Sequence, residues 1–334
     1  MKIFVTGGAG FIGSNFIRYI IDLHPDWEIT NFDKLTYAGN LENLKDIDKS
    51  PRYNFIKGDI SDRKTVGQAL DKGFDAIINF AAESHVDRSI LDSSPFVDTN
   101  FRGTQVLLDA AREYKVARYL QVSTDEVYGS REHDYFDESS SLNPSSPYSA
   151  CKAAADLLCL AYNKTHNLPI MITRCTNNYG PYQFPEKLIP LVITNAIEDK
   201  PIPIYGDGLY RRDWIYVMDH CSALATVLTK GRPGEIYNIA SSQEKTNLEL
   251  IRLILHILGK PESLITFIKD RPAHDRRYAI ASSKISKELG WEPSHSYEQA
   301  LKSTVEWYLN NRTWWERVKS KEYLEYYTRM YLNR

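Results

Sequence analysis

Short apolar segments alternate with helical segments through the first half of this 334-residue chain, and this alternation most constrains the fold. The apolar segments are nearly continuous in hydrophobic residues, as parallel strands are when helices cover both faces of their sheet. The segments between them carry apolar residues three and four positions apart, which is typical of amphipathic helices. We therefore predict an α/β fold with a doubly wound parallel sheet. The predicted strands are 2–7, 28–33, 53–59, 75–82, 118–124 and 170–175, and the predicted helices are 12–23, 62–72, 95–114 and 148–166.

The sequence changes in character beyond residue 176. Clusters of Pro, Gly and Tyr, such as NNYGPYQFP and KPIPIYGDGLYRRDW, interrupt the helical pattern and predict a smaller part with more loops. The segment EIYNIA at 235–240 is again similar to a buried strand, and we expect it to return to the main sheet. The two predicted parts are therefore interleaved, one formed by 1–175 with about 215–241 and the other by 176–214 with 242–334.

Composition and charge narrow the class of ligand. Hydrophobic residues make up 43% and charged residues 25% of the chain, as in soluble globular proteins. A formal net charge of −2 gives no general attraction to nucleic acid or to an anionic membrane, so we expect a small ligand. The N-terminal MKIFVTGGAGFIG suits a first strand better than a signal peptide, and no segment approaches the roughly 20 apolar residues of a membrane span. We expect a cytoplasmic protein that binds neither nucleic acid nor membrane.

The cysteines and histidines give no sign of a metal site or a disulfide framework. The chain has no C-x-x-C and no H-x-x-x-H pattern. We expect no bound metal, and we expect buried free thiols in a reducing compartment at Cys151, Cys159, Cys175 and Cys221.

The glycine-rich segment VTGGAGFIG lies directly between the first predicted strand and the first predicted helix. It fits the pattern G-x-G-x-x-G and the wider pattern G-x-x-G-x-x-G through Gly7, Gly8, Gly10 and Gly13. Such glycines let the backbone turn tightly and approach a pyrophosphate, whose charge then lies at the helix N-terminus. Asp33 ends the second predicted strand, where its carboxylate can bind the adenosine ribose hydroxyls and would repel a 2′-phosphate. The segment therefore predicts a Rossmann-type site for NAD rather than NADP, a preference that the neighbouring Lys34 weakens.

Two further segments carry groups that can transfer protons. YSACK places Tyr148 and Lys152 one helical turn apart at the start of a predicted helix. The phenol has an unperturbed pKa of about 10, and it becomes a usable base near neutrality when a lysine and a nicotinamide cation lie beside it. The adjacent acids Asp125 and Glu126 follow the predicted strand 118–124. Taken alone, this pair of acids is either a solvated surface turn or a pair of proton-transfer groups.

These segments resemble those of the extended short-chain dehydrogenases that act on nucleotide sugars, and within them the dTDP-glucose 4,6-dehydratases. The resemblance extends over nearly the whole chain, through TGGAGFIGSNF, DKLTYAGNLENL, AAESHVDRSI, STDEVYG, YSACKAAAD, NNYGPYQFPEKLIPL and RRDWIYV. Departures are small: Ala273 replaces a usual glycine, and Cys151 and Thr176 replace usual serines. The epimerase branch resembles SSATVYG at the acid-bearing segment, without the two acids, so STDEVYG is similar to the dehydratase version.

The resemblance implies dehydration of dTDP-glucose to dTDP-4-keto-6-deoxyglucose on bound NAD. Tyr148 would remove the proton of the sugar 4-hydroxyl while hydride passes from C4 to NAD, with Thr124 sharing the hydrogen bond and Lys152 beside them. Glu126 would then take the C5 proton, Asp125 would protonate the departing 6-hydroxyl, and hydride would return to C6. One acid must be ionised and the other protonated, and close carboxylates drive each other's pKa apart.

The resemblance also implies two sets of binding residues. The cofactor set is Gly7, Gly10, Phe11, Ile12, Gly13, Asp33, Lys34, Thr36, Asp59, Ile60, Ala81, Ala82, Ser84, Thr99, Tyr148, Lys152 and Asn178. The nucleotide-sugar set is Ser84, Asn177, Lys187, Leu188, Pro203, Tyr205, Arg212, Asn247, Arg271 and His274. Its cations can neutralise the substrate pyrophosphate. A homodimer of paired helices is expected from the family, and the tail 313–334 is expected to pack as a terminal helix without a chemical role.

Two alternatives stay open from the residues themselves. The first is another enzyme of the superfamily, either a UDP-sugar 4-epimerase or a dehydratase for a different nucleotide sugar. The acid pair opposes the epimerase, but the nucleotide base is assigned by the resemblance alone. The second is a cofactor-sensing binding protein that kept the fold and lost catalysis. The presence of every predicted catalytic residue argues against a binding protein without catalysis.

Overall fold

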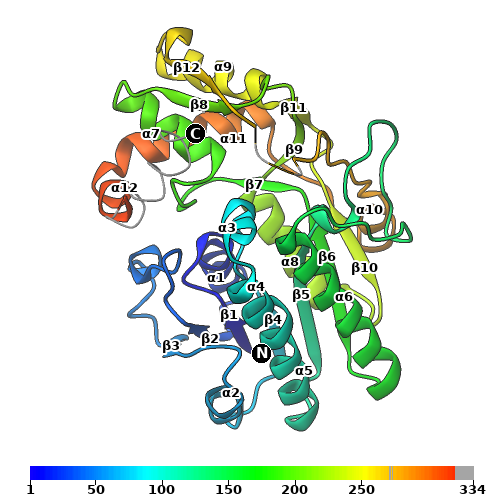
Figure 1. Cartoon of the computed structure of the whole chain (residues 1–334). Helices are drawn as coiled ribbons and strands as arrows, with labels where there is room; N and C mark the ends of the chain where they lie inside the picture. The colour runs from blue at the N-terminus through cyan, green and yellow to red at the C-terminus, as the bar shows by residue number, and fades with distance from the viewer. Residues whose placement is uncertain (271, 273, 320–334) are drawn as a thin grey trace.

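The computed structural model describes residues 1–270, 272 and 274–319. Parallel strands form a seven-stranded main sheet in the order β10-β6-β5-β4-β1-β2-β3 (Figure 1). Their bounds are β1 (Lys2–Thr6), β2 (Glu28–Asp33), β3 (Tyr53–Lys57), β4 (Ala76–Asn79), β5 (Arg118–Thr124), β6 (Ile170–Cys175) and β10 (Ile236–Ile239). The doubly wound parallel sheet is confirmed, and β10 confirms that the segment 235–240 returns to it.

Helices cover both faces of the main sheet (Figure 1). Alternate residues of β1 face opposite layers: Ile3 and Val5 pack with α1 and α8, whereas Phe4 packs with α2, α5 and α6. Both faces exclude water, so the strands need apolar side chains at nearly every position. The helix bounds are α1 (Phe11–Leu23), α2 (Arg63–Leu70), α3 (Val86–Leu91), α4 (Ser94–Phe96), α5 (Thr104–Glu113), α6 (Pro147–His166), α8 (Val217–Lys230) and α10 (Ser283–Leu289).

The prediction of one continuous helix over 95–114 is wrong. The short α4 leads into a π-helical turn, Val97–Gly103, before α5 begins. In this turn the Asn100 side chain accepts a hydrogen bond from the Glu83 N–H at 2.9 Å and donates one to the Glu83 carbonyl at 2.9 Å. Wider π turns are frequent at functional sites. Here the turn places Asn100 against the loop that follows β4.

The second part lies above the main sheet in Figure 1. It contains two small sheets, one with the order β11-β9-β7 and one in which β12 pairs with β8. Its own hydrophobic core includes Trp214, Leu250, Tyr308 and Trp315. The elements are β7 (Asn177–Tyr179), β8 (Ile202–Tyr205), β9 (Arg211–Tyr216), β11 (Glu244–Thr246), β12 (Ile265–Ile268), α7 (Leu188–Ile197), α9 (Asn247–Leu258), α11 (Tyr297–Asn310) and α12 (Arg312–Val318). Short 3-10 helices are η1 (Leu41–Leu44), η3 (Asp125–Tyr128) and η4 (Glu262–Leu264).

The chain crosses between the two parts more than once. After β9 it returns to the main sheet through α8 and β10, and after β12 it returns again through α10. Ile285 of α10 and the following Trp291 belong to the same buried cluster as α1 and α8. The α10 segment therefore packs on the main sheet, although it falls within the range 242–334 that the sequence suggests for the smaller part. Residues 320–334 of the predicted terminal helix lie outside the described residues.

The structure also bears on membrane, metal and thiol chemistry. Over 1–270, 272 and 274–319, no helix has both the length and the apolar character that a membrane crossing requires. The same residues contain no group of three or more His, Cys, Asp or Glu placed to hold a metal ion. All four cysteines are free and buried, as predicted.

Candidate active site

A pocket lies at the carboxyl ends of β1, β4 and β5. The strand order reverses between β1 and β4, because β2 and β3 follow β1 on one side while β5 and β6 follow β4 on the other. Loops diverge at such a switch point and leave the crevice in which open α/β sheets bind ligands. Every residue that the sequence suggested for catalysis or for the cofactor lines this pocket.

Glycines form one wall of the pocket at the N-terminus of α1. Gly7 has φ +70°, and a Cβ atom there would lie 2.6 Å from the main-chain nitrogen of Ala81. A Cβ atom on Gly13 would collide with the carbonyl oxygen of Gly7. No side chain caps α1 at Gly10, so the N–H groups of its first turn are available to a ligand. This cradle fits the pyrophosphate of a dinucleotide, and larger residues would fill it.

Asp33 ends β2 beside this cradle. Its carboxylate accepts hydrogen bonds from the Ala9 N–H at 2.9 Å and the Leu35 N–H at 2.8 Å. Burial raises the pKa of Asp33, while these two donors oppose the rise. The neighbouring Lys34 forms a 2.7 Å ion pair with Asp59, another pocket residue. This pairing offsets the charge of Lys34, which the sequence suggested would weaken a preference for NAD.

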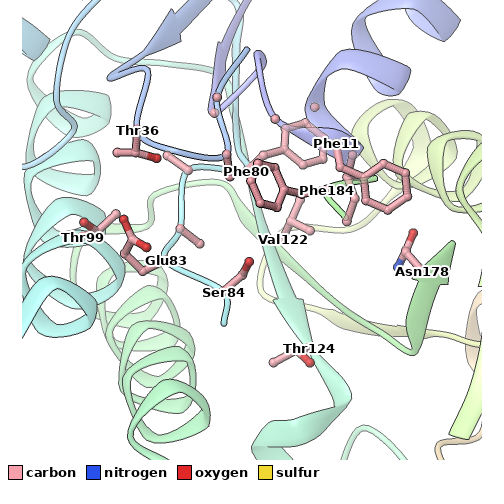
Figure 2. Close-up of a pocket in the computed structure, with 18 of the residues that line it drawn as sticks. Phe11, Thr36, Phe80, Glu83, Ser84, Thr99, Val122, Thr124, Asn178 and Phe184 are labelled. Carbon is pink, nitrogen blue, oxygen red and sulfur yellow. The ribbon is translucent and has the colours of Figure 1, made fainter. Parts of the chain in front are cut away.

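A further part of the pocket lining comes from the loop after β4, next to the glycines, and from the π-helical turn. Figure 2 shows Thr36, Thr99, Glu83 and Ser84 around one region of the pocket, with Phe11, Phe80 and Phe184 gathered in another. Sequence reasoning missed Phe80, Glu83 and Phe184. Glu83 belongs to the AAESHVD segment, but an acid in a loop is ordinarily solvated. Two hydrogen bonds join the Asn100 side chain to the Glu83 backbone in the pocket lining, and burial raises the pKa of the Glu83 side chain.

The acid-bearing segment forms the reactive end of the pocket. Strand β5 ends at Thr124, whose hydroxyl donates to Asp125 Oδ1 at 3.2 Å and accepts from the Glu126 N–H at 3.3 Å. Asp125 is only 3% exposed, which rules out a solvated surface turn for this residue. Its second oxygen, Oδ2, has no hydrogen-bond partner among the described residues. Glu126 lines the pocket beside it.

The electrostatics of the pair favour a protonated Asp125. Burial raises the pKa of Asp125 well above its usual value, and the neighbouring charge of Glu126 raises it further. The Arg212 charge and the Thr124 hydroxyl act in the opposite direction. An unpaired oxygen in a dry site disfavours the charged form of an acid. Burial and the Glu126 charge therefore favour the protonated form of Asp125 inside the pocket.

Tyr148 and Lys152 reach the pocket from the first turns of α6. Ser146 and Ser149 form a capping box at the start of this helix. Burial raises the pKa of Tyr148 well above its usual value, the Glu126 charge adds to this rise, and the Thr124 hydroxyl opposes it. Lys152 Nζ donates to the carbonyl oxygen of Val122 at 2.7 Å, and burial lowers the pKa of Lys152. The tyrosine thus stays neutral in the absence of a further cation.

The residues suggested for the nucleotide sugar are more dispersed. Ser84, Asn177 and Lys187 line the pocket, and Lys187 Nζ donates to the Ser84 carbonyl at 2.9 Å. Arg271 lies outside the described residues. The remaining residues of the set do not line this pocket; these are Leu188, Pro203, Tyr205, Arg212, Asn247 and His274.

Arg212 nevertheless acts on the reactive end of the pocket. Its guanidinium donates to the Asp275 carbonyl at 2.8 Å and lies 4.2 Å from the centre of the Tyr278 ring. The charge of Arg212 lowers the pKa of Asp125, so the two side chains are electrostatically coupled. Asn177 and Asn247 each bury an amide oxygen that has no hydrogen-bond partner among the described residues. Such oxygens are candidate contacts for a ligand that carries hydrogen-bond donors.

The fold and this site together define a class of enzyme. A Rossmann-type sheet with a glycine cradle, an acid at the end of the second strand and a Tyr–Lys pair on one helix is the arrangement of the extended short-chain dehydrogenases. The same pocket also contains the buried Asp125 and its neighbour Glu126.

Comparisons with known proteins agree with this class. The family model for GDP-mannose 4,6 dehydratase matches residues 4–304. A dTDP-glucose 4,6-dehydratase from Actinoplanes is 50% identical over 94% of this chain and 100% of its own length, and one from Escherichia coli is 49% identical over 100% of both chains. The crystal structure of DesIV, a dTDP-glucose 4,6-dehydratase from Streptomyces venezuelae with NAD and TYD bound, has a TM-score of 0.94 at 50% identity and covers 96% of this chain and 100% of its own. The chain belongs to this family of nucleotide-sugar 4,6-dehydratases and, within it, to the dTDP-glucose 4,6-dehydratases.

Proposed function

We propose that the chain converts dTDP-glucose to dTDP-4-keto-6-deoxyglucose and water on NAD that it holds throughout the cycle. The observation that carries this proposal is the buried Asp125, with its raised pKa, next to Glu126 in the pocket that also holds Tyr148 and Lys152. A simple oxidoreductase or epimerase needs no protonated acid at that point. Elimination of water needs one acid and one base close together.

The residues present fit NAD. The Gly7 and Gly13 cradle leaves room for a pyrophosphate at the N-terminus of α1, and Asp33 lies where it can accept hydrogen bonds from the adenosine ribose. Thr36, Asp59 and residues of the β4 loop would complete the site. When bound, NAD accepts hydride from C4 of the sugar and returns it to C6.

The chain's own groups move the protons. Tyr148 takes the proton of the 4-hydroxyl, aided by the Thr124 hydroxyl. Burial alone keeps the Tyr148 phenol protonated, so the base form needs the cation of Lys152 and that of the oxidised nicotinamide beside it. This requirement couples proton removal to the presence of oxidised cofactor.

The acid pair carries out the elimination. Glu126 removes the C5 proton that the 4-keto group has acidified, and Asp125 gives its proton to the departing 6-hydroxyl, which leaves as water. Glu126 then returns a proton to C5 as C6 is reduced. Tyr148 gains one proton and Asp125 loses one, so the net change in the sugar is the loss of one water, and proton exchange with solvent restores both groups before the next turnover.

We infer that the nucleotide diphosphate lies toward the second part. Lys187 lines the pocket from that part, and Arg212 lies beyond it with its charge coupled to Asp125. Both cations can bind phosphate oxygens, and Arg212 can do so with two parallel hydrogen bonds. Arg271 is proposed for the same role from the sequence alone.

We also infer a homodimer through the face formed by α6 and the neighbouring π-helical turn. Leu157 is 57% exposed on α6, and Val97 and Phe101 are 46% and 38% exposed on the turn. Apolar side chains that cluster on adjacent helices favour an interface. The mass of the chain in solution, measured for the parent and for Leu157→Lys, tests this inference. A location in the cytoplasm stays a prediction from the sequence.

The decisive experiment uses the purified protein without added cofactor. It is incubated separately with dTDP-, UDP-, GDP- and CDP-glucose, and the mass of each product is measured by mass spectrometry. We expect loss of one water from dTDP-glucose, with turnover far in excess of the bound NAD. A product of unchanged mass whose NMR spectrum shows inversion at C4 would indicate an epimerase. No change with any sugar, despite bound NAD, would indicate a binding protein.

A further inference from the structure

A buried carboxylate joins the cofactor side of the pocket to the second part. Glu186 lies in the loop before α7 and is only 4% exposed. Its Oε1 atom accepts a hydrogen bond from the Tyr37 hydroxyl at 2.9 Å. Its Oε2 atom accepts one from Arg88 Nη2 at 3.2 Å. Tyr37 belongs to the loop after β2 and Arg88 to α3, so one side chain connects three separate elements.

The three side chains pack closely as a group. The Arg88 guanidinium lies 4.0 Å from the centre of the Tyr37 ring, as in a cation–π contact. The ring of Phe184 meets the Tyr37 ring edge-on at 5.4 Å. Burial raises the pKa of Glu186, and the charges of Lys187 and Arg88 oppose this rise. Breaking such a group would leave buried polar atoms without partners, and this is costly in a dry environment.

The group spans the region that a bound cofactor would occupy. Thr36 and Ala38, on either side of Tyr37, line the pocket from the cofactor side. Phe184 and Glu186 line it from the loop before α7, and Figure 2 shows Phe184 and Thr36 as walls of the same pocket. The bond from Lys187 to the Ser84 carbonyl ties the same loop to the β4 side. A dinucleotide bound between these walls would be flanked by the loop after β2 on one side and by the loop before α7 on the other.

We propose that Tyr37, Arg88 and Glu186 form a clasp that must open before NAD can leave, so that the cofactor is retained between turnovers. The inference rests on the proposed function, in which hydride returns to the substrate and the cofactor is never exchanged. Both carboxylate oxygens of Glu186 are occupied by partners from the chain. Glu186 is therefore a positioning residue that acts through the loops it joins, and Lys187 next to it couples the clasp to the nucleotide-sugar side.

The test measures NAD release directly. Tyr37→Phe removes one hydroxyl and keeps the ring against Arg88, and Glu186→Gln keeps the shape but removes the charge. Each purified protein is diluted into a second enzyme that destroys free NAD, and the remaining bound NAD is followed by mass spectrometry. We expect release about tenfold to a hundredfold faster than from the parent, the effect of losing a buried hydrogen bond to a charged group. Tyr135→Phe, a change at an exposed tyrosine, serves as the matched control and should release NAD at the parent rate.

A second measurement separates the clasp from the chemistry. At saturating added NAD, kcat of Tyr37→Phe should stay within about twofold of the parent, while activity without added NAD should decline as the cofactor is lost. Release at the parent rate from both variants would overturn the clasp, as would a raised KM for dTDP-glucose with NAD retention unchanged. If the parent itself retained NAD but dehydrated no sugar, the proposed function would fail while the release rates still decided the clasp.

Discussion

The ammonium group of Lys152 donates a 2.7 Å hydrogen bond to the main-chain carbonyl of Val122. Val122 lies on β5, and Thr124, the last residue of that strand, begins the acid-bearing turn. A single strand therefore positions both the lysine of α6 and the two acids. Tyr148, one helical turn before Lys152, is thereby held in the pocket that contains Asp125.

Tyr148→Phe should severely slow oxidation at C4, because the variant lacks the group that we propose takes the proton of the 4-hydroxyl. We expect the rate to fall on the order of a hundredfold to ten-thousandfold. The absorbance of reduced nicotinamide after mixing with dTDP-glucose measures this step. Tyr53→Phe is a suitable control, since the Tyr53 hydroxyl binds Asn31 outside the pocket. A Tyr148→Phe protein that reduces its cofactor normally would remove Tyr148 from this role.

Glu126→Gln should separate oxidation from elimination. The amide keeps nearly the same shape, so Tyr148 can still act, but the 4-keto sugar then stalls for lack of a base. Reduced cofactor should accumulate on mixing with substrate, and exchange of the C5 hydrogen with solvent deuterium should fall about a hundredfold or more. Formation of the 6-deoxy product at a near-normal rate would contradict the assignment of Glu126.

Asp125→Asn should slow the departure of water, because an amide cannot give the 6-hydroxyl the proton that it needs. We expect a loss on the order of a hundredfold to ten-thousandfold in overall turnover. Exchange at C5 should survive, since Glu126 remains in place. The pattern of the two variants is the check: if Asp125→Asn loses C5 exchange and Glu126→Gln keeps it, the two roles are reversed.

The difference in stability between Asp125→Asn and the parent should depend on pH. Because the native pKa of Asp125 lies above its unfolded value, the folded chain binds more protons than the unfolded chain between those two values. The contribution of Asp125 is therefore complete below its unfolded pKa of about 3.9 and is lost as pH rises through the native pKa. The Tm of the variant should rise relative to that of the parent as pH rises, by about 1–2 °C for each 1 kcal/mol of stability that the parent loses.

Asp207→Asn serves as a control, because the pKa of Asp207 is shifted in the opposite direction to that of Asp125. The hydrogen bonds that the Arg276 guanidinium donates to Asp207 lower the pKa of Asp207 to about 2. The stabilisation by Asp207 is present above its unfolded pKa and is lost as pH falls through about 2. Asp207→Asn should therefore lose Tm relative to the parent at neutral pH and match it in strong acid. Equal pH dependence in both variants would contradict the burial of Asp125 as the cause.

Lys152→Met should weaken cofactor binding and activity together. The variant removes the cation that favours the base form of Tyr148, and it leaves the Val122 carbonyl without its donor. A buried acceptor left unpaired costs about 1–3 kcal/mol. The bound NAD per chain and kcat at saturating NAD are the two measurements. If Lys152→Met retained all of its NAD and its full activity, Lys152 would have only a structural role.

Much of the site could be read from the chain because its signals are local. The glycines, the acid after the second strand and the Tyr–Lys spacing are each set within one turn or one element. A parallel sheet then carries all of these segments to one edge, because every strand ends there. This is why the predicted cofactor residues meet in one pocket, although they are distributed between Gly7 and Asn178.

The sequence by itself determined the order of strands and helices, the cradle at Gly7 and the pairing of Tyr148 with Lys152, because short-range periodicity and backbone sterics fix these features. Tertiary structure alone decided the rest. Asn100 reaches Glu83 only through a π-helical turn, and Glu186 meets Tyr37 across 149 residues of chain. Burial likewise raised the pKa of Asp125, since a pKa depends on the solvent and charges that packing places around a group. No local pattern encodes such contacts, because they exist only once distant elements have packed together.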